Sequence, residues 1–144
     1  MSVNRVYKLY FDGSCPVNPG GTGAYGYAIY KEDKEIDSGH GIIGKGKGMT
    51  NNSAEHAAAT KGMEAALKIC EPFDELMIYG DSKLVVNHLN GIWKGRPNKA
   101  YYNFYLKSMT ALHNLRSKGV IVKISWIPRK DNERCDGLSK CDQK

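Results

Sequence analysis

Hydrophobic and polar positions alternate in some stretches of the chain and follow helical spacing in others. Five stretches rich in β-branched and aromatic residues are predicted strands, at residues 5–11, 24–30, 35–44, 75–79 and 120–126. Four stretches have helical composition or spacing, at residues 52–69, 82–89, 99–118 and 132–140. Runs of Gly, Asn, Pro and charged residues separate these segments. The predicted order is therefore three strands, a helix, a strand, two helices, a strand and a helix.

This order indicates an α/β fold with one mixed sheet and helices packed on its faces. The first three strands form an antiparallel meander, and a right-handed crossover places the fourth strand parallel to the first. Asp12 directly follows the first predicted strand, and Asp81 follows the fourth. If these strands are neighbours, both carboxylates lie at the carboxyl ends of strands, where open α/β sheets place their sites.

The charge distribution divides the chain into a neutral half and a basic half. The 144 residues, which suit a single domain over residues 1–144, carry a formal net charge of +6. Residues 1–72 hold 8 basic and 8 acidic side chains, whereas residues 73–144 hold 13 basic and 7 acidic ones. Residues 83–130 contain ten Lys or Arg and no carboxylate. This segregation favours a basic face for a nucleic-acid partner over a merely high isoelectric point.

Several classes of protein are excluded by composition. No apolar run approaches the roughly 20 residues of a membrane span, and the first residues are too polar for a signal peptide. The four cysteines form no Cys-x-x-Cys pair and no zinc-ligand spacing. We therefore expect a cytoplasmic protein with reduced thiols that binds no membrane. A monomer is expected because the chain has no heptad pattern.

Four carboxylates recur at comparable places, at strand ends or near helix starts: Asp12, Glu55, Asp81 and Asp136. Each has a structural explanation. The first lies in an Asp-Gly turn sequence, the second in a capping-box spacing from Asn52, the third at a helix start and the fourth in the early turns of the last helix. Taken together, they put several negative charges at one end of one sheet.

Such a cluster repels itself unless a cation neutralises it. Carboxylate oxygens without Cys or His favour Mg²⁺ or Mn²⁺ over zinc. Two such ions, about 4 Å apart, suit an in-line displacement at phosphorus. The carboxylates therefore predict a metal-dependent phosphodiesterase centre.

Ordered motifs along the chain resemble those of the type I ribonuclease H family. The motifs are Tyr10-Phe11-Asp12-Gly13-Ser14-Cys15, Asn18-Pro19-Gly20, Thr50-Asn51-Asn52-x-x-Glu55, Gly80-Asp81-Ser82 and Asn132-Glu133-Arg134-Cys135-Asp136. The resemblance extends from Tyr7 to about Lys140. It implies a five-stranded mixed sheet with flanking helices. It also implies metal-dependent cleavage of the RNA strand of RNA–DNA hybrids that leaves 3′-hydroxyl and 5′-phosphate ends. Two Mg²⁺ ions would be the cofactors, with Mn²⁺ as a substitute.

The resemblance also assigns roles by position. The metal ligands would be Asp12, Glu55, Asp81 and Asp136, and Glu55 would also sense the RNA 2′-hydroxyl. Close approach of substrate would be allowed by Gly13, Ser14 and Cys15, with the Cys15 thiol structural or groove-lining rather than nucleophilic. The minor groove would be lined by Asn18, Asn51 and Asn52, and Thr50 would hold a DNA phosphate. Trp93 would pack on the DNA strand, although a core position is its structural alternative. Further substrate contacts would come from Lys83, Lys94, Arg96, Lys99 and Asn132.

Two features depart from the family pattern. Many members carry a basic protrusion where this chain has about ten residues between Leu89 and Lys99. We also expect no separate hybrid-binding domain ahead of the first strand. Many members also carry a His in the loop before the last helix, whereas residues 126–132 contain none. We hypothesise that Arg129 partly replaces it, because a guanidinium stabilises phosphate charge but cannot act as a general base.

Three other functions compete with a hybrid-specific nuclease. One is a catalytically silent nucleic-acid-binding module, which the presence of all four carboxylates disfavours. Another is a related nuclease or resolvase acting on DNA, which the Asn18 and Thr50-Asn51-Asn52 motifs disfavour. A fragment of a reverse transcriptase is the third, and the initial Met argues against it.

Overall fold

Five strands form one mixed sheet in the computed structural model, which describes residues 4–141. In chain order they are β1 (Val6–Ser14), β2 (Gly20–Lys31), β3 (Lys34–Gly46), β4 (Glu75–Gly80) and β5 (Ile121–Trp126). The spatial order is β3-β2-β1-β4-β5. The first three strands pair antiparallel, whereas β4 runs parallel to both β1 and β5. The predicted mixed sheet and the pairing of the first and fourth strands are confirmed.

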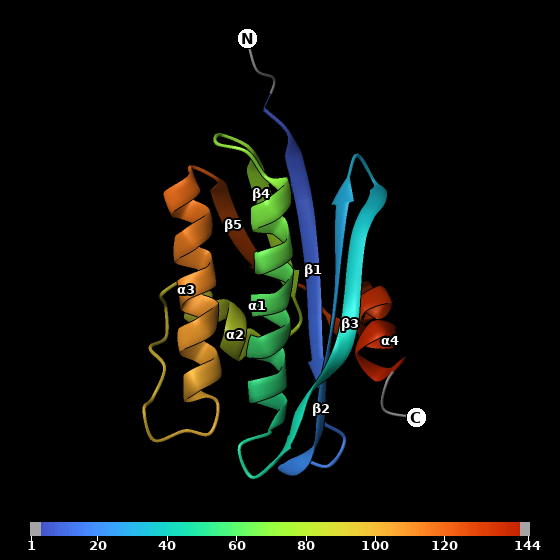
Figure 1. Cartoon of the computed structure of the whole chain (residues 1–144), viewed down its shortest axis with the longest axis vertical. Coiled ribbons are helices and arrows are strands. Elements are labelled where there is room, and N and C mark those ends of the chain that lie inside the picture. The colour runs from blue at the N-terminus through green and yellow to red at the C-terminus, as the bar shows by residue number, and fades with distance from the viewer. Residues whose placement is uncertain (1–3, 142–144) are drawn as a thin grey trace.

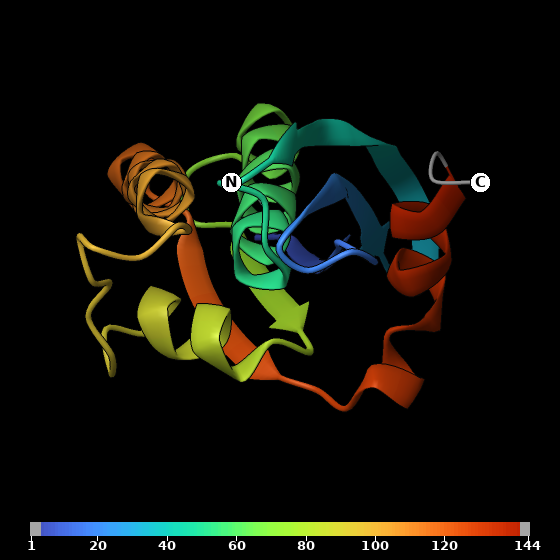
Figure 2. The ribbon, with the colours of Figure 1, turned by 90° about the horizontal axis from the view of Figure 1, so that it is seen from below.

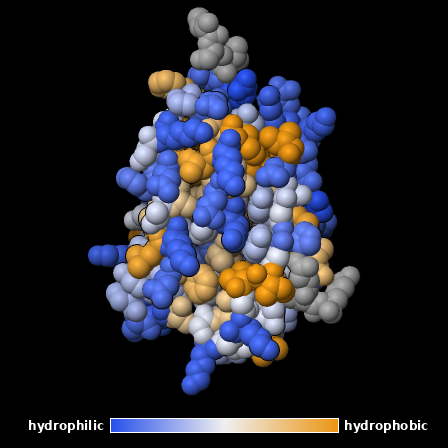
Figure 3. Space-filling view, in the orientation of Figure 1, coloured by the Kyte–Doolittle hydropathy of each residue, from blue (hydrophilic) through white to orange (hydrophobic). Residues whose placement is uncertain are grey.

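Helices cover both faces of the sheet (Figures 1 and 2). They are α1 (Asn51–Ile69), α2 (Lys83–Leu89), α3 (Tyr102–Lys118) and α4 (Glu133–Lys140), with a 3₁₀ turn at Arg129–Asp131 before α4. The first three helices lie together on one face, and α4 packs across β1 and β2 on the other. None of the helices within residues 4–141 combines the length and apolar character that crossing a bilayer requires. The face that Figure 3 shows mixes hydrophilic side chains with smaller hydrophobic areas.

The main core lies between the sheet and the three helices on its first face. Alternate residues of β1, namely Tyr7, Leu9 and Phe11, point into it, as the strand period requires. Small residues dominate the facing side of α1, so the helix lies close to the sheet. Gly62 shows this directly, because a Cβ atom there would lie 2.7 Å from a methyl group of Leu9.

Two predicted boundaries are wrong for identifiable reasons. The Asp12-Gly13 pair is not a turn but part of β1, because Asp12 pairs with Gly26 and Gly13 with Tyr25 on β2. The third helix begins at Tyr102 rather than at Lys99, because residues 99–101 form a turn in which the Tyr102 amide donates to the Lys99 carbonyl.

Two glycines of the sheet allow helices to approach the site from opposite faces. A Cβ atom on Gly13 would lie 2.5 Å from the Glu55 amide nitrogen of α1 and nearer still to the Ala54 carbonyl. A Cβ atom on Gly26 would lie 2.6 Å from the Leu138 Cβ and 2.8 Å from the Cys135 carbonyl oxygen of α4. Glycine at these positions therefore sets how closely α1 and α4 approach the end of β1.

Substitution of Gly26 by Ala tests this packing. The added methyl group forces α4 away from β2, and we expect a loss of about 1–3 kcal/mol in the free energy of unfolding. Gly137→Ala is the matched control, because nothing lies within 4 Å of a Cβ there and α4 gains helix propensity. Urea unfolding followed by circular dichroism measures both. Equal stability of the two variants would contradict the close approach of α4.

Candidate active site

Three carboxylates from three different elements meet at one end of the sheet. Asp12 comes from β1, Glu55 from the second turn of α1 and Asp81 from the residue after β4. Each offers an oxygen, and these oxygens all lie within 4.8 Å of one another. Asp12 and Glu55 are buried, and Asp81 is partly exposed. We call Asp12, Glu55 and Asp81 the acidic cluster.

Glu55 is directed into the cluster by the strand beside it. The Gly13 amide donates a hydrogen bond to Glu55 Oε1, which holds one carboxylate oxygen against β1. The capping-box interpretation of Asn52 and Glu55 is wrong, because Thr50 is the N-cap of α1 and its Oγ1 accepts from the Ser53 amide. Glu55 is therefore free of any capping role.

Asn132 lies buried behind the acidic cluster. Its Nδ2 donates to the Phe11 carbonyl oxygen at 2.8 Å and lies 3.5 Å from Asp81 Oδ2. The residue is only 2% exposed, and the expected contact of its side chain with substrate stays a prediction. Its position ties the end of β1 to the carboxylate that follows β4.

Burial and the repulsion between negative charges raise the pKa values of two carboxyl groups in the acidic cluster. Burial first, and then the charge of Asp81, raise the pKa of Asp12 to about 7, and Asp136 adds to this effect. Burial and the charge of Asp12 raise the pKa of Glu55 well above its ordinary value, and the Gly13 amide opposes this. The arrangement therefore disfavours full ionisation in the absence of a cation.

Asp136, the fourth predicted carboxylate, lies at the margin of the cluster. It lines the same hollow as Asp12 and Glu55, whose volume is about 430 Å³. Its oxygen is not among those within 4.8 Å, and it pairs instead with the Lys140 ammonium at 3.1 Å. Arg129 lines this hollow as well, so the residue expected to replace the absent His does lie beside the carboxylates.

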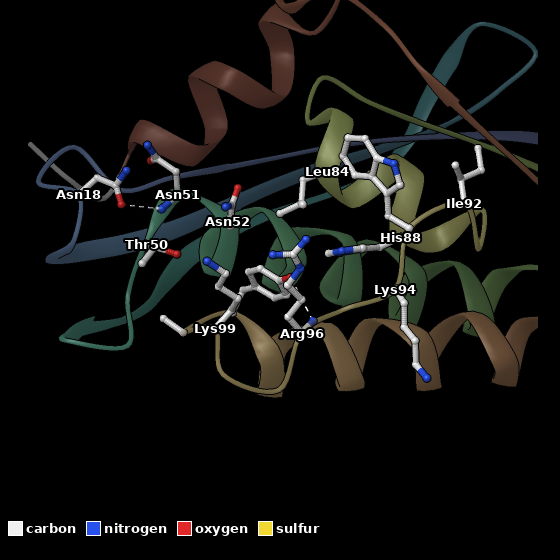
Figure 4. Close-up of a pocket in the computed structure, with 13 residues that line it drawn as sticks. Asn18, Thr50, Asn51, Asn52, Leu84, His88, Ile92, Lys94, Arg96 and Lys99 are labelled. Carbon is white, nitrogen blue, oxygen red and sulfur yellow. Dashed lines mark hydrogen bonds between the residues drawn. The ribbon is translucent and has the colours of Figure 1, made fainter.

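A second, larger cleft adjoins this hollow and contains most of the predicted substrate contacts (Figure 4). Its volume is about 1010 Å³, and Asn18 and Asn51 line both spaces. The predicted contacts that line the cleft are Asn18, Thr50, Asn51, Asn52, Trp93, Lys94, Arg96 and Lys99. Trp93 is 49% exposed, so its alternative as a core aromatic is wrong. Lys94 points away from the other labelled side chains in Figure 4.

Hydrogen bonds fix the asparagine side of the cleft. Asn18 Oδ1 accepts from the Asn51 amide at 3.1 Å, and Asn51 Oδ1 accepts from the Cys15 amide at 3.2 Å. Cys15 itself is 2% exposed, and its thiol donates to the Val17 carbonyl. The Ser14 hydroxyl donates to a carbonyl of α4. The thiol of Cys15 is therefore held inside the protein.

Comparison with known proteins identifies the family. The RNase H family model matches residues 4–143. The chain belongs to the ribonuclease H family. Ribonuclease H of Syntrophus aciditrophicus is 35% identical over 145 residues, which cover 92% of this chain and 77% of that protein.

Solved structures of this family share the fold. RNase H1 of the archaeon Halobacterium salinarum superposes with a TM-score of 0.77 at 30% identity, covering 92% of this chain and 93% of the other. LC11-RNase H1 in complex with an RNA/DNA hybrid gives a TM-score of 0.78 at 24% identity, covering 92% of each chain.

The basic side chains of this ribonuclease H do not form one continuous face. Lys83 lies outside the larger cleft, with its ammonium 4.9 Å from the centre of the Trp126 ring. Lys118 donates to the Leu67 carbonyl, and Lys123 lies 4.0 Å from Glu75, near the opposite end of the sheet. The basic side chains of the acid-free segment are therefore dispersed over the protein. Those that line the cleft are Lys94, Arg96 and Lys99.

Sequence reasoning missed a buried polar group under the cleft. His56 and His88 are 0% and 1% exposed, and His88 lines the cleft floor. His88 lies next to apolar positions in a predicted helix, and this placement is the sequence feature that could have indicated its burial.

The raised pKa of Asp12 predicts a pH-dependent stability. A carboxyl group whose pKa is higher in the folded state stabilises the fold while protonated, and this contribution is lost as pH rises towards about 7. We therefore expect Asp12→Asn to raise the free energy of unfolding relative to wild type at about pH 8, with a much smaller gain at about pH 4. Urea unfolding in EDTA measures this. Glu64→Gln, which removes an exposed carboxylate of α1, is the control and should show no such pH dependence.

Proposed function

We propose that this ribonuclease H uses the acidic cluster and Asp136 to hydrolyse the RNA strand of RNA–DNA hybrids, leaving 3′-hydroxyl and 5′-phosphate ends. The observation that carries the proposal is the convergence of Asp12, Glu55 and Asp81 beside a cleft with uncharged amides on one side and basic groups on the other. A related protein, LC11-RNase H1, has been solved with an RNA/DNA hybrid. The family membership and this geometry together support the activity.

The donor set fits magnesium. All the ligand atoms of the cluster are carboxylate oxygens, the kind that hard divalent cations prefer. The Cys135 thiol is buried, and burial together with the charge of Asp12 raises its pKa far above the ordinary value, so it stays protonated. We propose two Mg²⁺ ions as cofactors, for which Mn²⁺ can substitute. When bound, such ions supply Lewis-acid stabilisation of phosphate charge and a more acidic water nucleophile.

Some residues of the chain would bind the cations, and others orient the carboxylates that bind them. Asp12 and Asp81 would be shared ligands at the centre of the site. The Gly13 amide holds one oxygen of Glu55, which leaves the other oxygen for a cation or for the RNA 2′-hydroxyl. Asn132 keeps Asp81 oriented from behind. Asp136 lies at the margin of the cluster and would complete the site on the α4 side. To do so, its carboxylate would give up its ion pair with Lys140.

The side chains that line the cleft suit the recognition of an RNA–DNA hybrid. Asn18, Asn51 and Asn52 offer uncharged donors and acceptors, which suit the sugars and base edges of a minor groove. Thr50 also lines the cleft and would hold a DNA phosphate, although its Oγ1 caps α1. Arg96 and Lys99 face these residues across the cleft in Figure 4 and would bind phosphates of the DNA strand. Trp93, which also lines the cleft, would pack on the same strand.

We also propose that the protein acts as a monomer in the cytoplasm. The acidic cluster and the cleft both form within one chain. All four cysteines are free thiols, as expected in a reducing compartment.

The activity is tested with three labelled substrates of one sequence: an RNA–DNA hybrid, an RNA duplex and a DNA duplex. We expect cleavage of the hybrid RNA strand in Mg²⁺ or Mn²⁺, and none in EDTA. Asp12→Asn should lower the rate by at least about 100-fold while hybrid binding persists, because ligand loss affects chemistry more than phosphate contacts. Glu64→Gln is the matched control and should retain full activity. Cleavage in EDTA, or equal cleavage of the DNA duplex, would refute the proposal.

Arg129→Ala tests the hypothesis for the missing His. Arg129 lines the hollow of the carboxylates, and its loss should lower kcat by about 10-fold because a charge that stabilises phosphate is removed. Lys130→Ala, which changes an exposed neighbour, is the control. Steady-state kinetics on the hybrid measure both. An unchanged kcat for Arg129→Ala would show that this guanidinium does not take over the role.

A further inference from the structure

Three helices meet in a buried polar contact beneath the cleft. His56 of α1 lies with its Nε2 2.9 Å from Nδ1 of His88 on α2, and with its Nδ1 2.8 Å from Oγ of Ser108 on α3. All three side chains are almost completely buried, at 0%, 1% and 0% exposure. The contact therefore links the helices that carry the two sides of the cleft.

One arrangement of donors and acceptors satisfies every hydrogen bond in this contact. The Ser108 hydroxyl donates to the Tyr105 carbonyl at 2.9 Å, so its oxygen accepts from Nδ1–H of His56. Nε2 of His56 then accepts from Nδ1–H of His88. The reverse order would leave the Ser108–Tyr105 hydrogen bond unmade. Burial, with His88 beside it, lowers the pKa of His56 to about 3, and burial also lowers the pKa of His88, so both rings are neutral.

Two tyrosines rest on the imidazole pair. The Tyr101 ring centre lies 5.8 Å from that of His56 and 5.3 Å from that of His88. The Tyr105 ring meets the same two imidazoles edge to face, at 5.7 and 4.9 Å. The orientation of the imidazoles thus determines where both phenol rings lie.

The tyrosines in turn hold the basic segment, which we define as residues 94–99. The Tyr101 hydroxyl accepts a hydrogen bond from the Arg96 amide at 3.2 Å, drawn as a dashed line in Figure 4. Gly95 is buried against Tyr105, since a Cβ there would lie 2.5 Å from the ring. The basic segment has no regular secondary structure, so these contacts are its main anchors to the protein.

We propose that His56, His88, Tyr101 and Tyr105 form a positioning cluster that fixes the basic segment for the phosphate backbone of the substrate. The inference rests on the proposed function for the identity of that substrate. These residues act through Arg96 and its neighbours and do not touch the reacting atoms. The cluster therefore governs substrate affinity, while the acidic cluster governs the chemical step.

Tyr101→Phe is the principal test, because it removes only the hydroxyl that accepts the Arg96 amide. We expect KM for the hybrid to rise about 3- to 10-fold, the range for one net hydrogen bond, with kcat changed by less than about 2-fold. Hydrogen exchange of the Arg96 amide, followed by NMR without substrate, should become faster. Tyr102→Phe is the matched control, since it removes the neighbouring hydroxyl and should change neither quantity.

A second pair of variants tests the imidazoles. His88→Gln retains an N–H that can donate to His56 and should keep KM within about 2-fold of wild type, whereas His88→Leu cannot donate and should raise KM as Tyr101→Phe does. Thermal melting checks that both variants remain folded at the assay temperature. Equal KM values for the Gln and Leu variants would contradict a role for the directional hydrogen bond.

The double variant Tyr101→Phe with Arg96→Ala separates positioning from general structure. If the hydroxyl acts through Arg96, most of its effect on KM disappears once the Arg96 side chain is absent. Multiplicative effects, or unchanged KM and amide exchange in Tyr101→Phe, would overturn the inference. Faster Arg96 exchange in an enzyme that does not cleave hybrids would refute the proposed function and leave the anchoring intact.

Discussion

The mutual repulsion of three carboxylates at the end of the sheet is the constraint on which the rest of the site depends. Asp12 and Glu55 are buried, and Asp81 lies close to both, so burial and the neighbouring negative charges raise the pKa values of Asp12 and Glu55. Hydrophobic burial elsewhere must stabilise the fold against this local cost. The Gly13 amide and the Asn132 side chain then act as fixed partners that prevent the carboxylates from turning away from one another.

The cleft has two sides with different physical origins. The asparagine side is held by hydrogen bonds from backbone amides to asparagine side chains, which join the loop after β1 to the start of α1. The basic side is irregular chain supported from beneath by aromatic and imidazole rings. Uncharged amides on one side and cations on the other match a duplex in which one strand is distinguished by its sugar and the other by its phosphates.

The sequence was sufficient for the sheet and for three carboxylates because both follow from periodicity and strand order. Strands with alternating patterns pair in few ways, and a parallel β1–β4 pair necessarily brings Asp12 close to Asp81. The role of Asn132 could not be predicted, because a buried asparagine and a substrate-binding one have the same sequence signal. The positions of Lys118 and Lys123 away from the cleft could not be predicted either, because a continuous acid-free segment can wrap around both ends of a sheet. The His56–His88 contact depends on the relative placement of three helices, which no local pattern specifies.

The link between Asn132 and the Phe11 carbonyl also concerns the order in which the molecule is made. It joins residues separated by 121 positions, so the carboxylate pair of β1 and β4 lacks this support until α4 has been synthesised and docked. Long-range closures of this kind come late and slow the folding of mixed sheets. A nascent chain that ends before α4 carries Asp12, Glu55 and Asp81 but lacks the support that holds them in register. Completion of the acidic cluster is thereby coupled to the synthesis of residue 132 and of α4.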